Sequence, residues 1–169
     1  MFEIKKHFVR LTLTSCLIVS AALLGSATSG LAEKTISAPE VYTASKDKLA
    51  LSGYDPVAYF VASSPKKGLT EISAVHQGVT WRFENEANKA AFLAQPEKYA
   101  PQYGGYCAYA VSQGYTASAD PTVWEIIDGK LYLNYNRSVG VSWSKQSQSY
   151  IASGDVNWAK RTPNEPRTN

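Results

Sequence analysis

Apolar and polar residues alternate most clearly in the middle of the chain. The segment Val79–Phe83 has this period, which is typical of a strand with one buried face. Ile72–Gln77 precedes it across a glycine, so these two segments are expected to pair as a β-hairpin. A second hairpin is predicted for Val123–Ile127 and Lys130–Tyr135, because Asp128-Gly129 between them is a strong signal for a two-residue turn.

Helical signals follow each hairpin. Asn85 is expected to cap a helix over Glu86–Gln95, and Pro96 should end or kink this helix. After the second hairpin, three apolar residues have helical spacing: Val139, Trp143 and Tyr150. Gly154 is the expected end of that helical region, and Asp155 the expected cap of a final turn.

These elements predict an α+β fold. A short strand is expected at Lys48–Leu51, and no internal repeat is evident. We expect one small domain over residues 48–160, built of short antiparallel strands and hairpins with two or three helices. Residues 33–47 are expected to form a flexible leader, and residues 161–169 a disordered tail.

The N-terminus predicts export. Three basic residues precede an apolar stretch from Leu11 to Leu24, and small residues then end at Ala32. This order is that of a secretory signal peptide over residues 1–32, with cleavage before Glu33 and release into the periplasm or the medium. The alternatives are a retained membrane anchor, or a lipoprotein attached at Cys16. The apolar stretch is short and carries hydroxyl side chains, whereas a membrane span needs about 20 apolar residues.

Charge and ligand counts restrict the chemistry. Without residues 1–32 the chain keeps 14 Lys and Arg against 13 Asp and Glu, and no basic cluster could track nucleic acid. One cysteine, Cys107, and one histidine, His76, remain. An intramolecular disulfide is therefore impossible, and a Cys₄ or Cys₂His₂ zinc site cannot be assembled.

Several separate motifs, in order, carry a resemblance to a known family. They are Gly53–Phe60 (GYDPVAYF), Gly78–Phe83 (GVTWRF), Gln95–Tyr99 (QPEKY), Tyr103–Val111 (YGGYCAYAV) and Asp128–Tyr135 (DGKLYLNY). Together they resemble the exported bacterial branch of the YHS domain family, over most of residues 48–160. The resemblance implies a small extracytoplasmic binding domain, in a family of which some members bind metal.

The chain departs from the pattern of the metal-binding members. Those members carry a cysteine after Asp-Pro-Val and a Cys-Ser-x-x-Cys run after the Phe of the second strand. Ala58, Glu84 and Asn88 stand at these three positions here. Because soft metals are held by thiolates, the family's metal chemistry is not implied at these positions.

Five residues remain as site candidates. Tyr54, Asp55, Tyr106 and Cys107 are candidate ligand-binding residues, and Cys107 with His76 is the candidate metal pair. The alternatives are purely structural roles: a small buried cysteine, a histidine packed at the rim of the core, and an aspartate that caps its own turn before a proline. Two-coordinate copper is the metal chemistry that suits one Cys and one His, and zinc is expected to bind weakly or not at all.

The leading functional hypothesis is a periplasmic, non-enzymatic YHS-like binding module. It would hold a small ligand or a metal ion near Cys107 and His76, without nucleic acid and without stable membrane insertion after processing. One alternative is a thiol enzyme with Cys107 as nucleophile and His76 as base. Another is a structural or partner-binding protein with no ligand.

Overall fold

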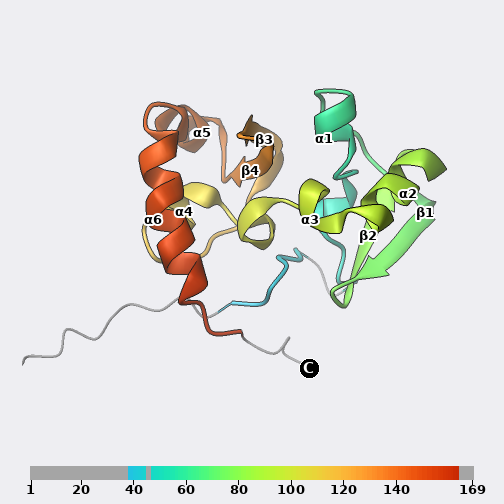
Figure 1. Ribbon diagram of the computed structural model, residues 1–169, viewed down its shortest axis with the longest axis horizontal. Helices are drawn as coiled ribbons and strands as arrows, with labels where there is room; N and C mark the ends of the chain where they lie inside the picture. Colours follow the sequence, from blue (N-terminus) through green and yellow to red (C-terminus); the bar gives the residue numbers. More distant parts are fainter. Residues whose placement is uncertain (1–37, 45–46, 164–169) are drawn as a thin grey trace, which may run out of the picture. The chain divides into compact units, whose positions relative to one another are not determined.

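A computed structural model describes residues 38–44 and 47–163 of the 169-residue chain (Figure 1). The predicted signal peptide, residues 1–32, and the last part of the predicted tail, residues 164–169, lie outside the described residues. All described residues belong to one compact unit, residues 33–169. No helix in the described part of the chain has both the length and the apolar character needed to cross a membrane.

Two antiparallel hairpins organise the fold, and a helix follows each of them (Figure 1). The first group is β1 (Leu69–His76), β2 (Val79–Phe83) and α2 (Glu86–Ala94). The second group is β3 (Asp120–Ile127), β4 (Lys130–Asn134) and α5 (Arg137–Ser144). The other elements are the 3₁₀ turns η1 (Leu51–Gly53) and η2 (Gln102–Gly105), and the helices α1 (Ala58–Val61), α3 (Pro96–Tyr99), α4 (Ala108–Ser112) and α6 (Ser147–Ala159). The predicted α+β class and both predicted hairpins are confirmed.

The two groups are copies of one structural pattern. Each runs from a 3₁₀ turn through a short helix, an eight-residue strand, a two-residue turn and a five-residue strand to a capped helix. Both hairpins have the same pairing, with an irregularity near the start of the long strand. Leu69 corresponds to Asp120 and Val79 to Lys130, both 51 positions later. We call residues 51–94 the first repeat and residues 102–144 the second repeat.

Local geometry agrees between the repeats. The two turns, Gln77-Gly78 and Asp128-Gly129, share φ values of 51° and 72°. Asn85 and Asn136 both cap their helices, each by accepting a hydrogen bond from the backbone N–H three residues on. The cap predicted at Asn85 is confirmed.

The sequence does not reveal the repeat because little besides turn and cap residues is shared. Gly53-Tyr54-Asp55 corresponds to Gly105-Tyr106-Cys107, so an acid in one repeat is a thiol in the other. Buried positions also differ in polarity. Phe83 at the end of β2 corresponds to Asn134 at the end of β4.

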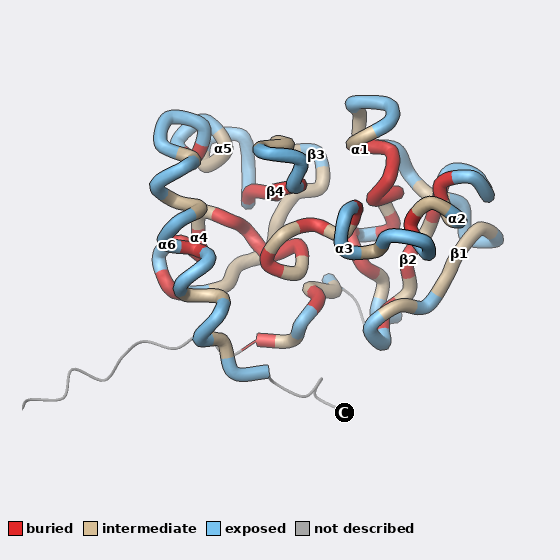
Figure 2. The backbone as a smooth tube through the Cα atoms, in the orientation of Figure 1, coloured by how far each residue is buried: buried red, intermediate tan, exposed pale blue. Residues whose placement is uncertain are grey.

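Strand β4 is buried along most of its length (Figure 2), and its residues belong to two buried clusters. Leu131 and Leu133 belong to a cluster with Trp81, Phe83 and Phe92 of the first repeat. The residue between them, Tyr132, belongs to the other cluster, whose buried members also include Tyr103, Tyr106 and Trp143. Because successive side chains of a strand point to opposite faces, β4 is buried on both faces and ties the repeats into one folded unit.

Three details differ from the sequence prediction. The described residues form six α-helices; three of them have at least eight residues, and the four- and five-residue helices α1, α3 and α4 were not predicted. The strand predicted at Lys48–Leu51 is wrong, since Leu49 makes a single bridge to Thr80 and the left-handed backbone of η1 begins at Leu51.

The predicted helix end at Gly154 is also wrong, because α6 continues to Ala159. A Cβ atom at Gly154 would lie only 2.7 Å from the Tyr103 hydroxyl oxygen. The glycine therefore serves close packing inside the helix. Asp155 does not cap a new turn but accepts a hydrogen bond from Tyr103.

Candidate functional site

Asp55 is fully buried and its carboxylate is committed to the fold. Oδ1 accepts the backbone N–H of Val57 at 2.8 Å, which confirms the predicted turn role. Oδ2 accepts the backbone N–H of Glu84 at 2.8 Å and the side-chain amide of Asn88 at 2.6 Å. Positions 84 and 88 therefore both contact this carboxylate, and Ala58, the first residue of α1, directly follows Val57, which also contacts it.

Tyr54 lies beside Asp55 but faces a different group. The Lys67 ammonium lies 4.0 Å from the centre of the Tyr54 ring, and the two backbones form a bridge. This is a cation–π contact at the protein surface, worth about 0.5–1 kcal/mol. Tyr54 therefore helps to hold the loop before β1.

Cys107 is only 2% exposed and precedes α4 as its N-cap residue. Its Sγ lies 3.8 Å from the side-chain oxygen of Asn134, which also accepts the backbone N–H of Tyr109 at 3.2 Å. The Tyr109 N–H corresponds to the Val57 N–H of the first repeat, which Asp55 accepts. Asn134 thus takes the role of acceptor in the second repeat that Asp55 has in the first. Cys107 fills space beside this bond.

Tyr106 packs between aromatic rings. Its ring centroid lies 5.1 Å from that of Tyr42 and 5.9 Å from that of Trp158. Burial raises the pKa of Tyr106 to about 12, although the nearby Arg161 lowers it. The phenol therefore stays protonated at neutral pH.

His76 occupies the end of β1, where it is partly buried. Its ring meets the ring of Phe92 edge to face at 5.6 Å. It lines two cavities of about 330 and 490 Å³ that also share Gln77, Pro96 and Glu97. His76 is thus a packed residue at the rim of the core that also contacts open space.

We call the cavity of about 330 Å³ the His76 cleft. Its walls come from the β1–β2 turn, α3, η2 and the end of α6. Among its lining residues are the carboxylates of Glu40, Glu97 and Asp155, and this lining includes neither Lys nor Arg. Glu40 pairs with Arg161, whereas Glu97 and Asp155 make no ion pair among the described residues, so these two carboxylates favour a cationic group.

Tyr103 forms the strained part of this cleft. Its φ of 54° is left-handed, which is uncommon for a bulky residue. Its hydroxyl donates a 2.9 Å hydrogen bond to Asp155 and also lies 3.3 Å from the Ile151 carbonyl oxygen. Burial, and then the bond to Asp155, raise the pKa of this phenol. Neither Tyr103 nor Asp155 is among the predicted site residues, although Tyr103 begins the YGGYCAYAV motif of the family resemblance.

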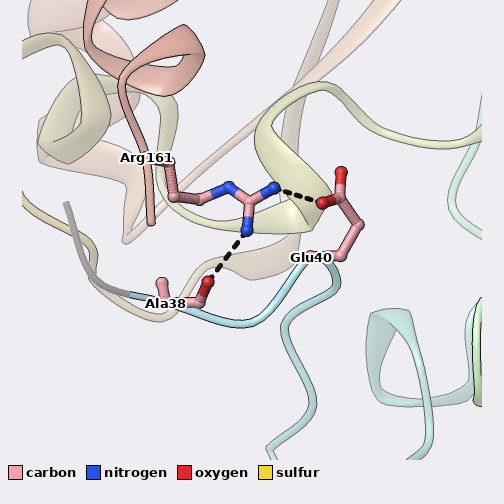
Figure 3. A network of polar contacts seen from close by, with 3 residues as sticks. All are labelled: Ala38, Glu40 and Arg161. Carbon is pink, nitrogen blue, oxygen red and sulfur yellow. Dashed lines mark hydrogen bonds and ion pairs between the residues drawn. The ribbon is translucent and has the colours of Figure 1, made fainter. Parts of the chain in front are cut away.

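Residues 38–44, part of the predicted leader, pack against this region. Ala38 and Val41 are buried. The Arg161 guanidinium donates a 3.0 Å hydrogen bond to the Ala38 carbonyl and pairs with Glu40 (Figure 3). It also lies over the Trp158 ring, 4.4 Å from the ring centre. Glu40 and Val41 also line the His76 cleft, so this segment forms part of its wall.

The predicted candidates do not converge on one centre. Cys107 and His76 belong to different repeats, and none of the contacts found in the described ranges joins them. Within residues 38–44 and 47–163, no group of three or more His, Cys, Asp or Glu side chains could hold a metal ion. His76 is the one predicted candidate that lines a described cleft.

Comparison with known proteins leaves these residues and their geometry as the basis for the function. No family model, no curated protein and no solved structure matches the chain.

Proposed function

We propose that this chain is an exported, non-enzymatic YHS-like binding module whose ligand occupies the His76 cleft. One observation carries the proposal: an imidazole lies in a cavity of about 330 Å³ together with carboxylates and the strained turn at Tyr103. Concave sites with a few convergent polar groups are typical of ligand binding. Strained backbone is also commoner at such sites than elsewhere.

The surroundings of Cys107 favour binding over thiol chemistry. A nucleophilic cysteine needs access to its substrate and a base within hydrogen-bonding reach. Cys107 is 2% exposed, and its Sγ contacts an amide oxygen of Asn134. The ligand is therefore assigned to His76 and not to Cys107.

The likeness to YHS domains supports a binding role without thiolate-bound metal. Glu84 and Asn88, which replace two of the family's cysteines, both donate hydrogen bonds to Asp55. A buried carboxylate that accepts three N–H bonds is satisfied without a metal ion. This end of the first repeat has a structural role in the proposal, and the ligand lies in the cleft at the other end of β1.

Export is part of the same proposal and has its own test. The basic residues, the apolar stretch and the small residues before Glu33 support cleavage after Ala32. N-terminal sequencing of protein from the periplasmic fraction should begin at Glu33. A chain that keeps Met1, or a lipid on Cys16, would contradict it.

Native mass spectrometry tests the binding role. The wild type, His76→Ala and Cys107→Ser are isolated from the periplasm under identical mild conditions. We expect the wild type and Cys107→Ser to carry the same additional mass, and His76→Ala to have lost it. A mass that depends on Cys107, or no added mass on any of the three, would overturn the proposal. The size of the mass identifies the ligand as an ion or an organic molecule.

A further inference from the structure

A second cleft, which we call the α5 cleft, lies in the second repeat. It has a volume of about 440 Å³ and is formed by β3, the end of β4 and α5. Trp124, Asn134, Arg137, Trp143 and Lys145 are among its lining residues. None of the residues assigned to the His76 cleft takes part in it.

Trp143 lines this cleft and carries an unused donor. The side chain is fully buried, and its indole N–H has no hydrogen-bond partner in the described part of the chain. Leaving a buried donor unpaired costs free energy, so such a group calls for an explanation. Packing alone does not provide one, because the corresponding residue of the first repeat is Phe92, which is equally buried.

Position 134 also changes from an apolar residue in the first repeat to a polar residue in the second. Asn134 lines the cleft and is buried, whereas the first repeat has Phe83 at the corresponding place. The first repeat thus fills this layer with two phenyl rings, Phe83 and Phe92. The second repeat places an amide and an indole there, beside a cavity. The Asn134 oxygen accepts the Tyr109 N–H, so the unpaired indole of Trp143 is the polar replacement in this layer that indicates recognition of a polar group.

The charges at the rim specify the sign of that group. Arg137 and Lys145 line the cleft, are exposed, and make no ion pair within the described ranges. The corresponding residues of the first repeat are Glu86 and Ala94, so the two cations are particular to the second repeat. The one carboxylate in the lining, Glu125, accepts a hydrogen bond from Ser144.

We propose that the α5 cleft binds a small organic carboxylate with a planar apolar body. A carboxylate oxygen accepts the indole N–H of Trp143, and the charge is held by Arg137, with Lys145 adding to the potential. Guanidinium groups suit carboxylates because they donate two parallel hydrogen bonds. The partly buried ring of Trp124 and the side chain of Val141 line the space for the apolar body.

The repeat supplies matched variants for the test. Trp143→Phe and Arg137→Glu place the first repeat's own residues in the second, so both changes suit this backbone. Benzoate serves as the probe, and benzylamine, which has the same ring with a positive charge, serves as the control ligand. Binding is followed on the ¹⁵N-labelled mature chain through the indole N–H signal of Trp143.

Benzoate should shift the Trp143 signal saturably, while benzylamine should not. Arg137→Glu should weaken benzoate binding at least tenfold. Trp143→Phe should weaken it similarly, and binding to this variant is measured through the backbone amide signals of α5. His76→Ala should leave benzoate binding unchanged, which separates this site from the His76 cleft. No saturable shift, or equal affinity in wild type and Arg137→Glu, would overturn the proposal even if Trp143→Phe fails to fold.

Discussion

The side-chain amide of Asn88 donates a 2.6 Å hydrogen bond to the carboxylate of Asp55, 33 positions earlier in the chain, and both side chains are buried. The same carboxylate oxygen accepts the backbone N–H of Glu84. One acid thereby fastens the turn before α1 to the end of β2 and to the first turn of α2. Asp55 is consequently a structural residue, although its position beside Tyr54 made it a candidate for ligand binding.

Replacing Asp55 should therefore damage stability more than any function. Asp55→Ala leaves three N–H donors without their acceptor, and each unpaired buried donor costs about 1–3 kcal/mol. We expect a loss of about 3 kcal/mol or more in the free energy of unfolding, measured with urea. Asp120→Ala is the matched control, because Asp120 makes the same kind of turn with Thr122 at an exposed position. If both variants lose the same amount, the buried network contributes nothing beyond a turn.

The second hairpin turn allows a test of backbone conformation alone. Gly129 has φ of 72°, and a Cβ atom there would meet nothing within 4 Å. A side chain is therefore penalised by conformation and not by a clash. We expect Gly129→Val to lower the unfolding free energy by about 1–2 kcal/mol, and Gly129→Asn to be tolerated, because Asn adopts this region more readily.

Gly78 at the corresponding turn of the first repeat gives an internal control. It has the same φ and equally open surroundings. Gly78→Val should cost a similar amount in the same urea titration. A Gly129→Val chain as stable as the wild type would show that the turn relaxes to another conformation.

Local signals explain what the sequence predicted well. The hairpin turn at Asp128-Gly129 and the cap at Asn85 depend on neighbours within three residues, and both are confirmed. The Tyr103 hydrogen bond to Asp155 joins residues 52 positions apart, and no short-range pattern announces it. Gly154 shows the difference clearly, since a glycine read as a helix end is needed for contact with Tyr103.

The same difference between local signals and long-range contacts applies to the candidate site. His76 could be singled out because it is the only histidine after residue 32, yet its cleft is completed by distant residues such as Asp155 and Glu40. Cys107 was singled out equally easily by its rarity. Its burial depends on β4, through the bridge to Leu133 and the contact with Asn134, which the sequence could not predict.

Stability should fall at alkaline pH through the buried phenols. Burial, with the nearby Asp155 and Asp128 carboxylates, raises the pKa of Tyr132 from 10.0 to about 12. The folded chain then holds this proton where the unfolded chain has lost it. The stabilisation is complete below pH 10 and is lost as the pH rises from 10 to 12, by about 1.4 kcal/mol per pH unit for one group.

Urea titrations at pH 9, 10 and 11 on the wild type and Tyr132→Phe measure this effect. The variant should lose less stability between pH 10 and 11 than the wild type, by about 1 kcal/mol. Identical slopes in the two proteins would show that Tyr132 ionises normally in the folded state.

The residues of this chain and the family resemblance lead to different expectations for metal binding. A zinc ion shared by Cys107 and His76 needs bond lengths of about 2.3 Å to sulfur and 2.0–2.1 Å to nitrogen, so the two donor atoms must lie within roughly 4.5 Å of each other. Cys107 is instead buried against Asn134, and His76 packs on Phe92. We therefore expect calorimetric titration of a chain that begins at Glu33 to show weak zinc binding or none, and no change in Cys107→Ser. Copper(I) prefers thiolate, so any copper binding should be lost in Cys107→Ser and should require exposure of the buried sulfur.

His76→Ala serves as the second variant in both titrations. Tight zinc binding that survives both substitutions would place a metal site at residues that neither the sequence pattern nor the described contacts single out.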